Sequence, residues 1–195
     1  MITEKDHWFS LLQSIYAETS NLASGVDCYN SCDGRCCPRK SVSNHTGFII
    51  FLPFEPDYIA HMLNMELTDL EIMWHIQKSQ VKTSNGNLIY ISWTRDCPFI
   101  KQGLCGIYKL RPFDCVSFPV IPILEDGNLR FELGKKCPLV SQTTISFQGK
   151  ISEVWERLKD ELPSDWWNIV RKLVVSNDTL TFEPQTNKKY FGIVD

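Results

Sequence analysis

The sequence contains no hydrophobic run long enough to cross a membrane. Its longest apolar stretches, GFIIFLPF and VSFPVIPIL, contain proline and fall short of the roughly 20 residues that a spanning helix needs. The chain also has no excess of basic residues, because 20 Lys and Arg face 23 Asp and Glu, for a net charge of −3. A protein without a basic field is not expected to bind nucleic acid. We therefore expect neither a membrane nor a nucleic acid as partner.

The sequence also shows neither a secretory signal nor a glycine-rich loop that could bind a nucleotide. The opening residues MITEKDHWFS carry Glu4 and Asp6 and include no apolar segment followed by a cleavage site. No glycine-rich turn stands between an expected strand and an expected helix. These features predict a cytoplasmic protein, in which thiols stay reduced unless a metal holds them.

What the sequence does contain is eight cysteines in two groups. The first group lies within CYNSCDGRCC and the second begins in CPFIKQGLCGIYKLRPFDC. Disulfide frameworks are typical of short secreted chains, whereas 195 residues with 43% hydrophobic content can bury a core without them. The pattern therefore indicates metal binding, with the candidate ligands Cys28, Cys32, Cys36, Cys37, Cys97, Cys105, Cys115 and Cys137.

The spacing of these cysteines favours an iron–sulfur cluster, of the 4Fe–4S type, over zinc. Zinc knuckles are built on C-x2-C pairs, which the sequence lacks. Cys37, Cys97 and Cys137 each precede a proline, as ligand cysteines do in ferredoxin-type loops. Two four-cysteine zinc sites are the alternative, since eight ligands divide evenly. Cys36 and Cys37 are adjacent, so their side chains diverge. We expect one of them to bind the metal, and the other to serve a second metal or to be a packed thiol.

The remaining patterns predict an α+β fold that is mainly helical, with short strands and a hairpin around an irregular cysteine-rich metal-binding centre. We expect a single domain over residues 1–195, with metal-binding blocks at 28–37 and 97–138. The hairpin should turn at Glu125-Asp126-Gly127. Helices are expected at 4–22, at 69–80 behind a capping box of Thr68 and Glu71, and twice within 150–176, and strands at 46–54 and 88–93.

The two cysteine blocks resemble the YkgJ-type cysteine-cluster family, whose members are described as zinc- or iron-chelating domains. The match covers residues 28–37 and 97–119, with Cys137-Pro138 as a final element. Val116 departs from it, because arginine is common there, and so does the x3-x3 spacing of the first block. The second block carries the match through Cys97, Pro98, Cys105, Ile107, Tyr108, Arg111, Pro112, Cys115, Phe118 and Pro119.

A more distant resemblance is to the flagellin lysine N-methylases, which carry a comparable cysteine block. It implies S-adenosylmethionine-dependent methyl transfer to a lysine of a protein substrate as the enzymatic alternative. Arg111 and Tyr108 are then the candidate cofactor-binding residues, the first for a carboxylate and the second for a proton. The alternative roles are structural: Arg111 would balance the negative charge of the thiolates, and Tyr108 would pack beside them.

Overall fold

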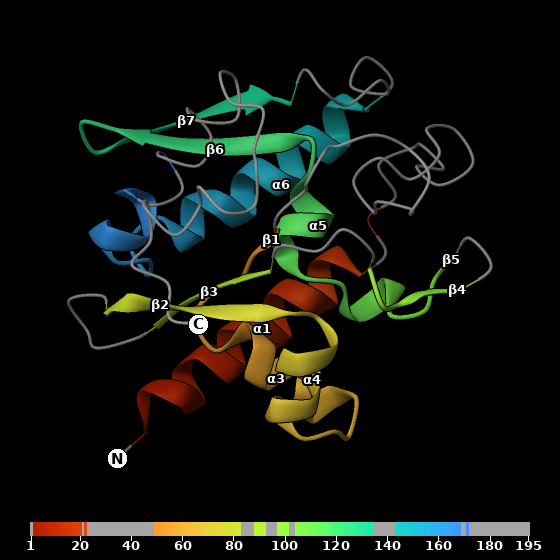
Figure 1. The fold of residues 1–195 in the computed structure, drawn as a ribbon. Helices are drawn as coiled ribbons and strands as arrows, with labels where there is room; N and C mark the ends of the chain where they lie inside the picture. The colour runs from red at the N-terminus through yellow and green to blue at the C-terminus, as the bar shows by residue number, and fades with distance from the viewer. Residues whose placement is uncertain are drawn as a thin grey trace, which may run out of the picture.

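A computed structural model of the chain describes residues 2–20, 22, 49–82, 88–92, 97–101, 104–134, 143–168 and 171. Within these ranges the protein is a mixture of α-helices and short antiparallel strand pairs, which confirms the α+β class. In Figure 1 the β6–β7 hairpin and α6 lie above a three-stranded sheet, and α1, α3 and α4 lie below it. No helix of the described segments is long and apolar enough to span a membrane.

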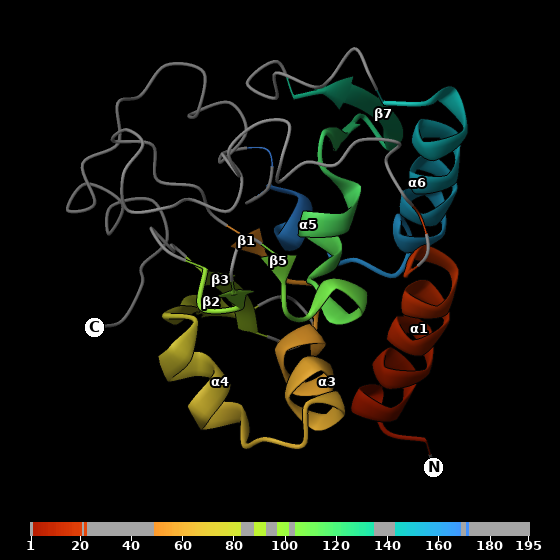
Figure 2. The same cartoon turned by 90° about the vertical axis from the view of Figure 1, so that its right-hand side faces the viewer.

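The first helix, α1, spans Glu4–Thr19 and confirms the expected helix at 4–22, apart from its last turn. Its start is fixed by a capping box, in which the backbone N–H of Asp6 donates to Oγ1 of Thr3 and the N–H of Thr3 donates to Oδ2 of Asp6. The buried face of the helix carries Trp8, Leu12, Ile15, Tyr16 and Thr19. Figure 2 shows α1 and α6 on one side of the molecule.

The segment expected to be one helix at 69–80 is instead a helix followed by a strand. Helix α3 (Glu55–Met62) leads to α4 (Leu67–Met73), and β2 then runs over Ile76–Lys82. The backbone of His75 turns to φ 50°, a left-handed conformation that ends the helix. The expected capping box is also absent, because Glu66 is the N-cap and makes no side-chain capping bond.

Pairing with β3 explains why the second half of that segment is extended. Strand β3 (Leu88–Ser92) lies between β1 (Ile49–Ile50) and β2 in the sheet, and all pairs are antiparallel. Ser92 faces Ile49 on one side and Ile76 on the other. Strand β3 confirms the expected strand at 88–93 over its described residues, and β1 covers two of the residues described within the expected 46–54.

The expected hairpin around Asp126-Gly127 is confirmed. Strands β6 (Val120–Glu125) and β7 (Asn128–Leu133) pair in register up to Glu125 and Asn128. The two turn residues both have positive φ, 49° at Asp126 and 75° at Gly127, as a two-residue hairpin turn requires. Helix α6 (Ile145–Leu158) packs against β6.

An aromatic cluster joins α6 and the helical segment 164–168 to α5. Helix α6 ends before Pro163, and residues 164–168 are again helical, so the expected break between the two C-terminal helices is confirmed. Trp155, Trp166 and Trp167 lie against one another with ring centroids 5.1–6.0 Å apart. Phe113 adds to this cluster from the second cysteine block, 4.9 Å from Trp155.

Candidate metal centre

Three of the eight predicted ligands lie within the described residues. Cys97, Cys105 and Cys115 are thiols, and each is partly buried. The other predicted ligands lie outside the described residues, as does most of the first metal-binding block: Cys28, Cys32, Cys36, Cys37 and Cys137. The second block is therefore the described part of the predicted centre.

A small hairpin brings Cys97 and Cys105 together. Strand β4 (Ile100–Lys101) pairs with β5 (Leu104–Cys105), and Ile100 stands opposite Cys105. The chain turns sharply just before β4, since the N–H of Ile100 donates to the carbonyl of Cys97 at 3.2 Å. The two sulfurs are close enough for the charge of Cys105 to raise the pKa of Cys97.

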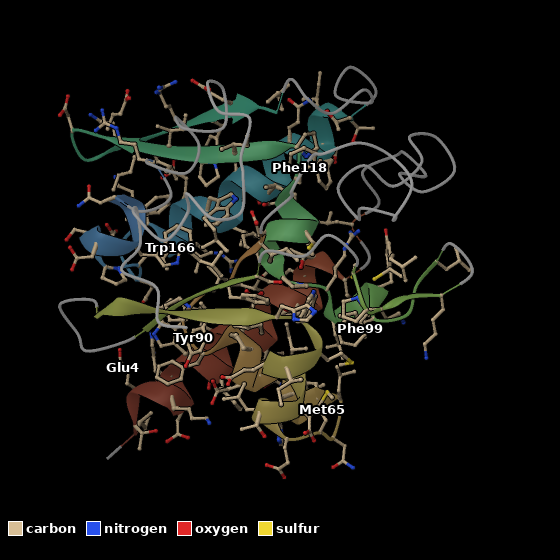
Figure 3. The ribbon with its side chains drawn as sticks, in the orientation of Figure 1. Glu4, Met65, Tyr90, Phe99, Phe118 and Trp166 are labelled. Carbon is tan, nitrogen blue, oxygen red and sulfur yellow. The ribbon has the colours of Figure 1, made fainter. Side chains whose placement is uncertain are left out.

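Gly106 allows the two sides of this hairpin to approach each other. Its backbone N–H donates to the carbonyl oxygen of Phe99 at 2.7 Å. A Cβ at position 106 would lie 3.1 Å from that same oxygen, closer than side chains normally approach. Phe99 in turn packs against Trp74, with ring centroids 4.8 Å apart. Figure 3 labels Phe99 where the hairpin joins the rest of the fold, so the thiol pair rests on the hydrophobic core.

Backbone N–H groups lower the pKa of both thiols, against a larger effect of burial. Burial raises the pKa of the Cys97 thiol, while hydrogen bonds from the N–H groups of Phe99 and Ile100 lower it. Burial likewise raises the pKa of Cys105, and the N–H of Ile107 opposes that effect. Amide donors of this kind stabilise a thiolate as a metal ligand. Burial has the larger effect, so the neutral thiols are favoured until a cation stabilises the thiolates. A bound metal ion is such a cation.

Arg111 and Tyr108 lie beside this pair and contact each other. The guanidinium carbon of Arg111 is 4.1 Å from the centroid of the Tyr108 ring. The charge of Arg111 also lowers the pKa of Cys105 against the larger effect of burial. Tyr108 begins the short 3₁₀ helix η1 (Tyr108–Leu110), and its side chain is exposed. This geometry agrees with a charge-balancing arginine held by an aromatic ring.

Cys115 lies on a different element, α5 (Phe113–Ser117). Its charge raises the pKa of buried Tyr16, so its sulfur lies near α1. Among the described Cys, His, Asp and Glu side chains, no three gather closely enough to hold a metal ion. Within the described residues, Cys97 and Cys105 therefore lie near each other and Cys115 stands on a separate element, and its role as a ligand stays a prediction.

Two carboxylates that contact α5 or belong to it were not predicted from the sequence: buried Glu55 and partly buried Asp114. Glu55 is 0% exposed, and burial raises its pKa to about 7. Burial also raises the pKa of Asp114 to about 6, although the N–H of Ile50 donates to Oδ2 of that carboxylate at 3.1 Å. The sequence held one signal, because Glu55 is an acidic residue within the apolar segment FLPFEP.

Comparison with known proteins gives this centre no relative. Neither protein-family models, nor curated protein sequences, nor solved structures match the chain.

Proposed function

We propose that this protein binds a metal in a cysteine-rich centre of which Cys97 and Cys105 form one part. The observation that supports this is the β4–β5 hairpin, which holds Cys105 opposite Ile100, with Cys97 at the turn just before β4. The two partly buried thiols lie near each other, and backbone N–H groups lower the pKa of both. Two thiols held only for packing would not need such donors, whereas ligand thiolates are regularly stabilised by them.

The remaining ligands in this proposal are the cysteines that the spacing predicts. Cys115 and Cys137 complete the second group, and the first group supplies Cys28, Cys32, Cys36 and Cys37. The donor set is all thiolate, so it suits an iron–sulfur cluster or zinc. An iron–sulfur cluster would supply one-electron chemistry, and zinc would supply stability alone. Arg111 offsets part of the negative charge that either set of thiolates creates.

Metal and sulfide analysis of protein purified without oxygen tests this function. Iron with acid-labile sulfide and a broad visible absorption would establish an iron–sulfur protein. A colourless protein with bound zinc would establish a zinc site and move the search to binding partners. Protein that holds no metal, and takes up none when iron with sulfide or zinc is supplied under reducing conditions, would contradict the proposal.

Methyl transfer to a protein lysine stays a prediction of the resemblance alone. Titration of the metal-loaded protein with S-adenosylmethionine in a calorimeter tests it. Saturable binding would support the enzyme, and the absence of heat would count against it.

A further inference from the structure

The side chain of Glu55 forms hydrogen bonds with three separate segments of the chain. It stands at the start of α3, and its two carboxylate oxygens accept three hydrogen bonds. Oε1 accepts from the hydroxyl of Tyr16 at 2.9 Å and from the N–H of Phe113 at 2.7 Å. Oε2 accepts from the N–H of Leu52 at 2.8 Å. One carboxylate therefore connects α1, the segment before α3 and α5.

The bond to Phe113 has a particular consequence for α5. Phe113 is the first residue of that helix, and the first N–H groups of any helix have no partner within it. The residue in the N-cap position is Pro112, which makes no side-chain capping bond. Glu55 therefore caps α5 from a distant part of the chain, because its side-chain oxygen accepts a hydrogen bond from the first N–H of the helix.

Helix α5 depends on such contacts because it is short. It has five residues, too few to be stable by themselves in water. A second carboxylate, that of Asp114, ties it to β1 through Ile50, and Phe113 packs on Trp155. Cys115 is the third residue of the helix, so its sulfur is placed by whatever fixes the first turn.

We infer that Glu55 is a positioning residue for Cys115. It orients the first turn of α5 against α1 and α3, and so it sets where the Cys115 thiol stands relative to the core. Tyr16 supports the same arrangement, because its hydroxyl donates to Glu55 while its ring lies within electrostatic reach of Cys115. The placement of Cys115 follows from these contacts alone, whereas its consequence for metal retention rests on the proposed function.

Thiol alkylation of the metal-free full chain, read at each cysteine by mass spectrometry, tests the placement. In Glu55→Gln one acceptor oxygen becomes an NH2 group, so at least one of the three hydrogen bonds is lost and the contacts that hold α5 against α1 and α3 weaken. We expect Cys115 to be alkylated about tenfold faster than in the wild type, because the free energy needed to unfold α5 locally is lowered. Cys97 and Cys105 should change by less than about twofold, since their hairpin makes no bond to Glu55.

Two further variants keep the test decisive. Glu18→Gln is the matched control, because Glu18 also joins two helices, through Arg157 at 2.8 and 2.9 Å, but on the exposed surface. It should leave the alkylation of Cys115 at the wild-type rate. Tyr16→Phe removes one donor and keeps the carboxylate, and it should raise the rate about threefold. If Glu55→Gln fails to fold, the alkylation rate of Cys115 in the folded Tyr16→Phe protein decides the question.

Two results would overturn the inference. One is a wild-type rate at Cys115 in folded Glu55→Gln and Tyr16→Phe. The other is an equal rise at Cys97, Cys105 and Cys115, which would mean general loss of stability. Release of bound metal to a chelator should also be about tenfold faster in Glu55→Gln and unchanged in Glu18→Gln. A wild type that binds no metal would overturn the proposed function and leave the alkylation result standing.

Discussion

The guanidinium of Arg111 lies over the ring of Tyr108, 4.1 Å from its centroid, and its charge partly offsets the burial that raises the pKa of Cys105. Arg111 is held in this place by a stacking contact and not by an ion pair with any carboxylate among the described residues. Its positive charge lowers the pKa of the neighbouring Cys105 thiol.

Replacing Arg111 with glutamine should weaken metal binding about fivefold, because a thiolate near a cation is stabilised by their attraction. The matched control is Lys109→Gln, which removes the same charge from an exposed position two residues away. Affinity measured by competition with a chelator should fall in the first variant and stay near the wild type in the second. Equal losses in both would show that only the net charge matters, and no loss in either would remove Arg111 from the site.

The buried carboxyl of Glu55 should make stability depend on pH. Burial raises its pKa from 4.5 to about 7, so the folded protein holds a proton there that the unfolded chain releases. The stability that the neutral form contributes is present at low pH and is lost as pH rises through about 7. Asp114, raised to about 6, acts with the same sign.

The effect of Glu55 can be separated by comparing two proteins at two pH values. Between pH 5 and pH 8 the wild type should lose about 2 kcal/mol more of its free energy of unfolding than Glu55→Gln does. Urea unfolding of both proteins measures the difference, and contributions from Asp114 or from a metal are common to the two. A wild type that gains stability over this range relative to the variant would contradict the assignment.

Two buried tryptophans differ in their hydrogen bonds and offer a matched pair of substitutions. Trp155 and Trp166 are each 3% exposed. Nε1 of Trp166 donates to the carbonyl of Phe51 at 3.3 Å, whereas Nε1 of Trp155 has no partner within the described part of the chain. Trp166→Phe leaves a buried carbonyl unpaired, so it should cost about 1 kcal/mol more than Trp155→Phe. Chemical unfolding gives both values, and a larger loss in Trp155→Phe would contradict the argument.

Local patterns predicted the elements whose signals lie within a few residues. The turn at Asp126-Gly127 was predictable because two positive φ angles favour that pair of residues. The helix beginning at Glu4 was predictable from its apolar spacing. The strand at Ile76–Lys82 was not, since its extended form depends on pairing with β3 and on the left-handed backbone of His75.

The candidate site shows the same limit more sharply. Cysteine spacing put Cys97 and Cys105 in one group of predicted ligands, and the structure places Cys105 on β5 and Cys97 just before β4. That these thiols bind a metal stays a prediction. The role of Glu55 was not predictable, because its partners Tyr16 and Phe113 are 39 and 58 residues away in the sequence. Tertiary hydrogen bonds of this kind leave no periodic pattern that a single sequence could reveal.

The most direct test of the metal centre is the metal content of the wild type and of a Cys97→Ser, Cys105→Ser double variant. Both proteins would be purified and reconstituted without oxygen, and iron, zinc and acid-labile sulfide would be measured per chain. We expect the wild type to retain metal and the double variant to lose one metal centre. The double variant should keep its helical circular dichroism at a temperature below the melting points of both proteins. Equal metal content in the two folded proteins would contradict the claim that this thiol pair binds the metal.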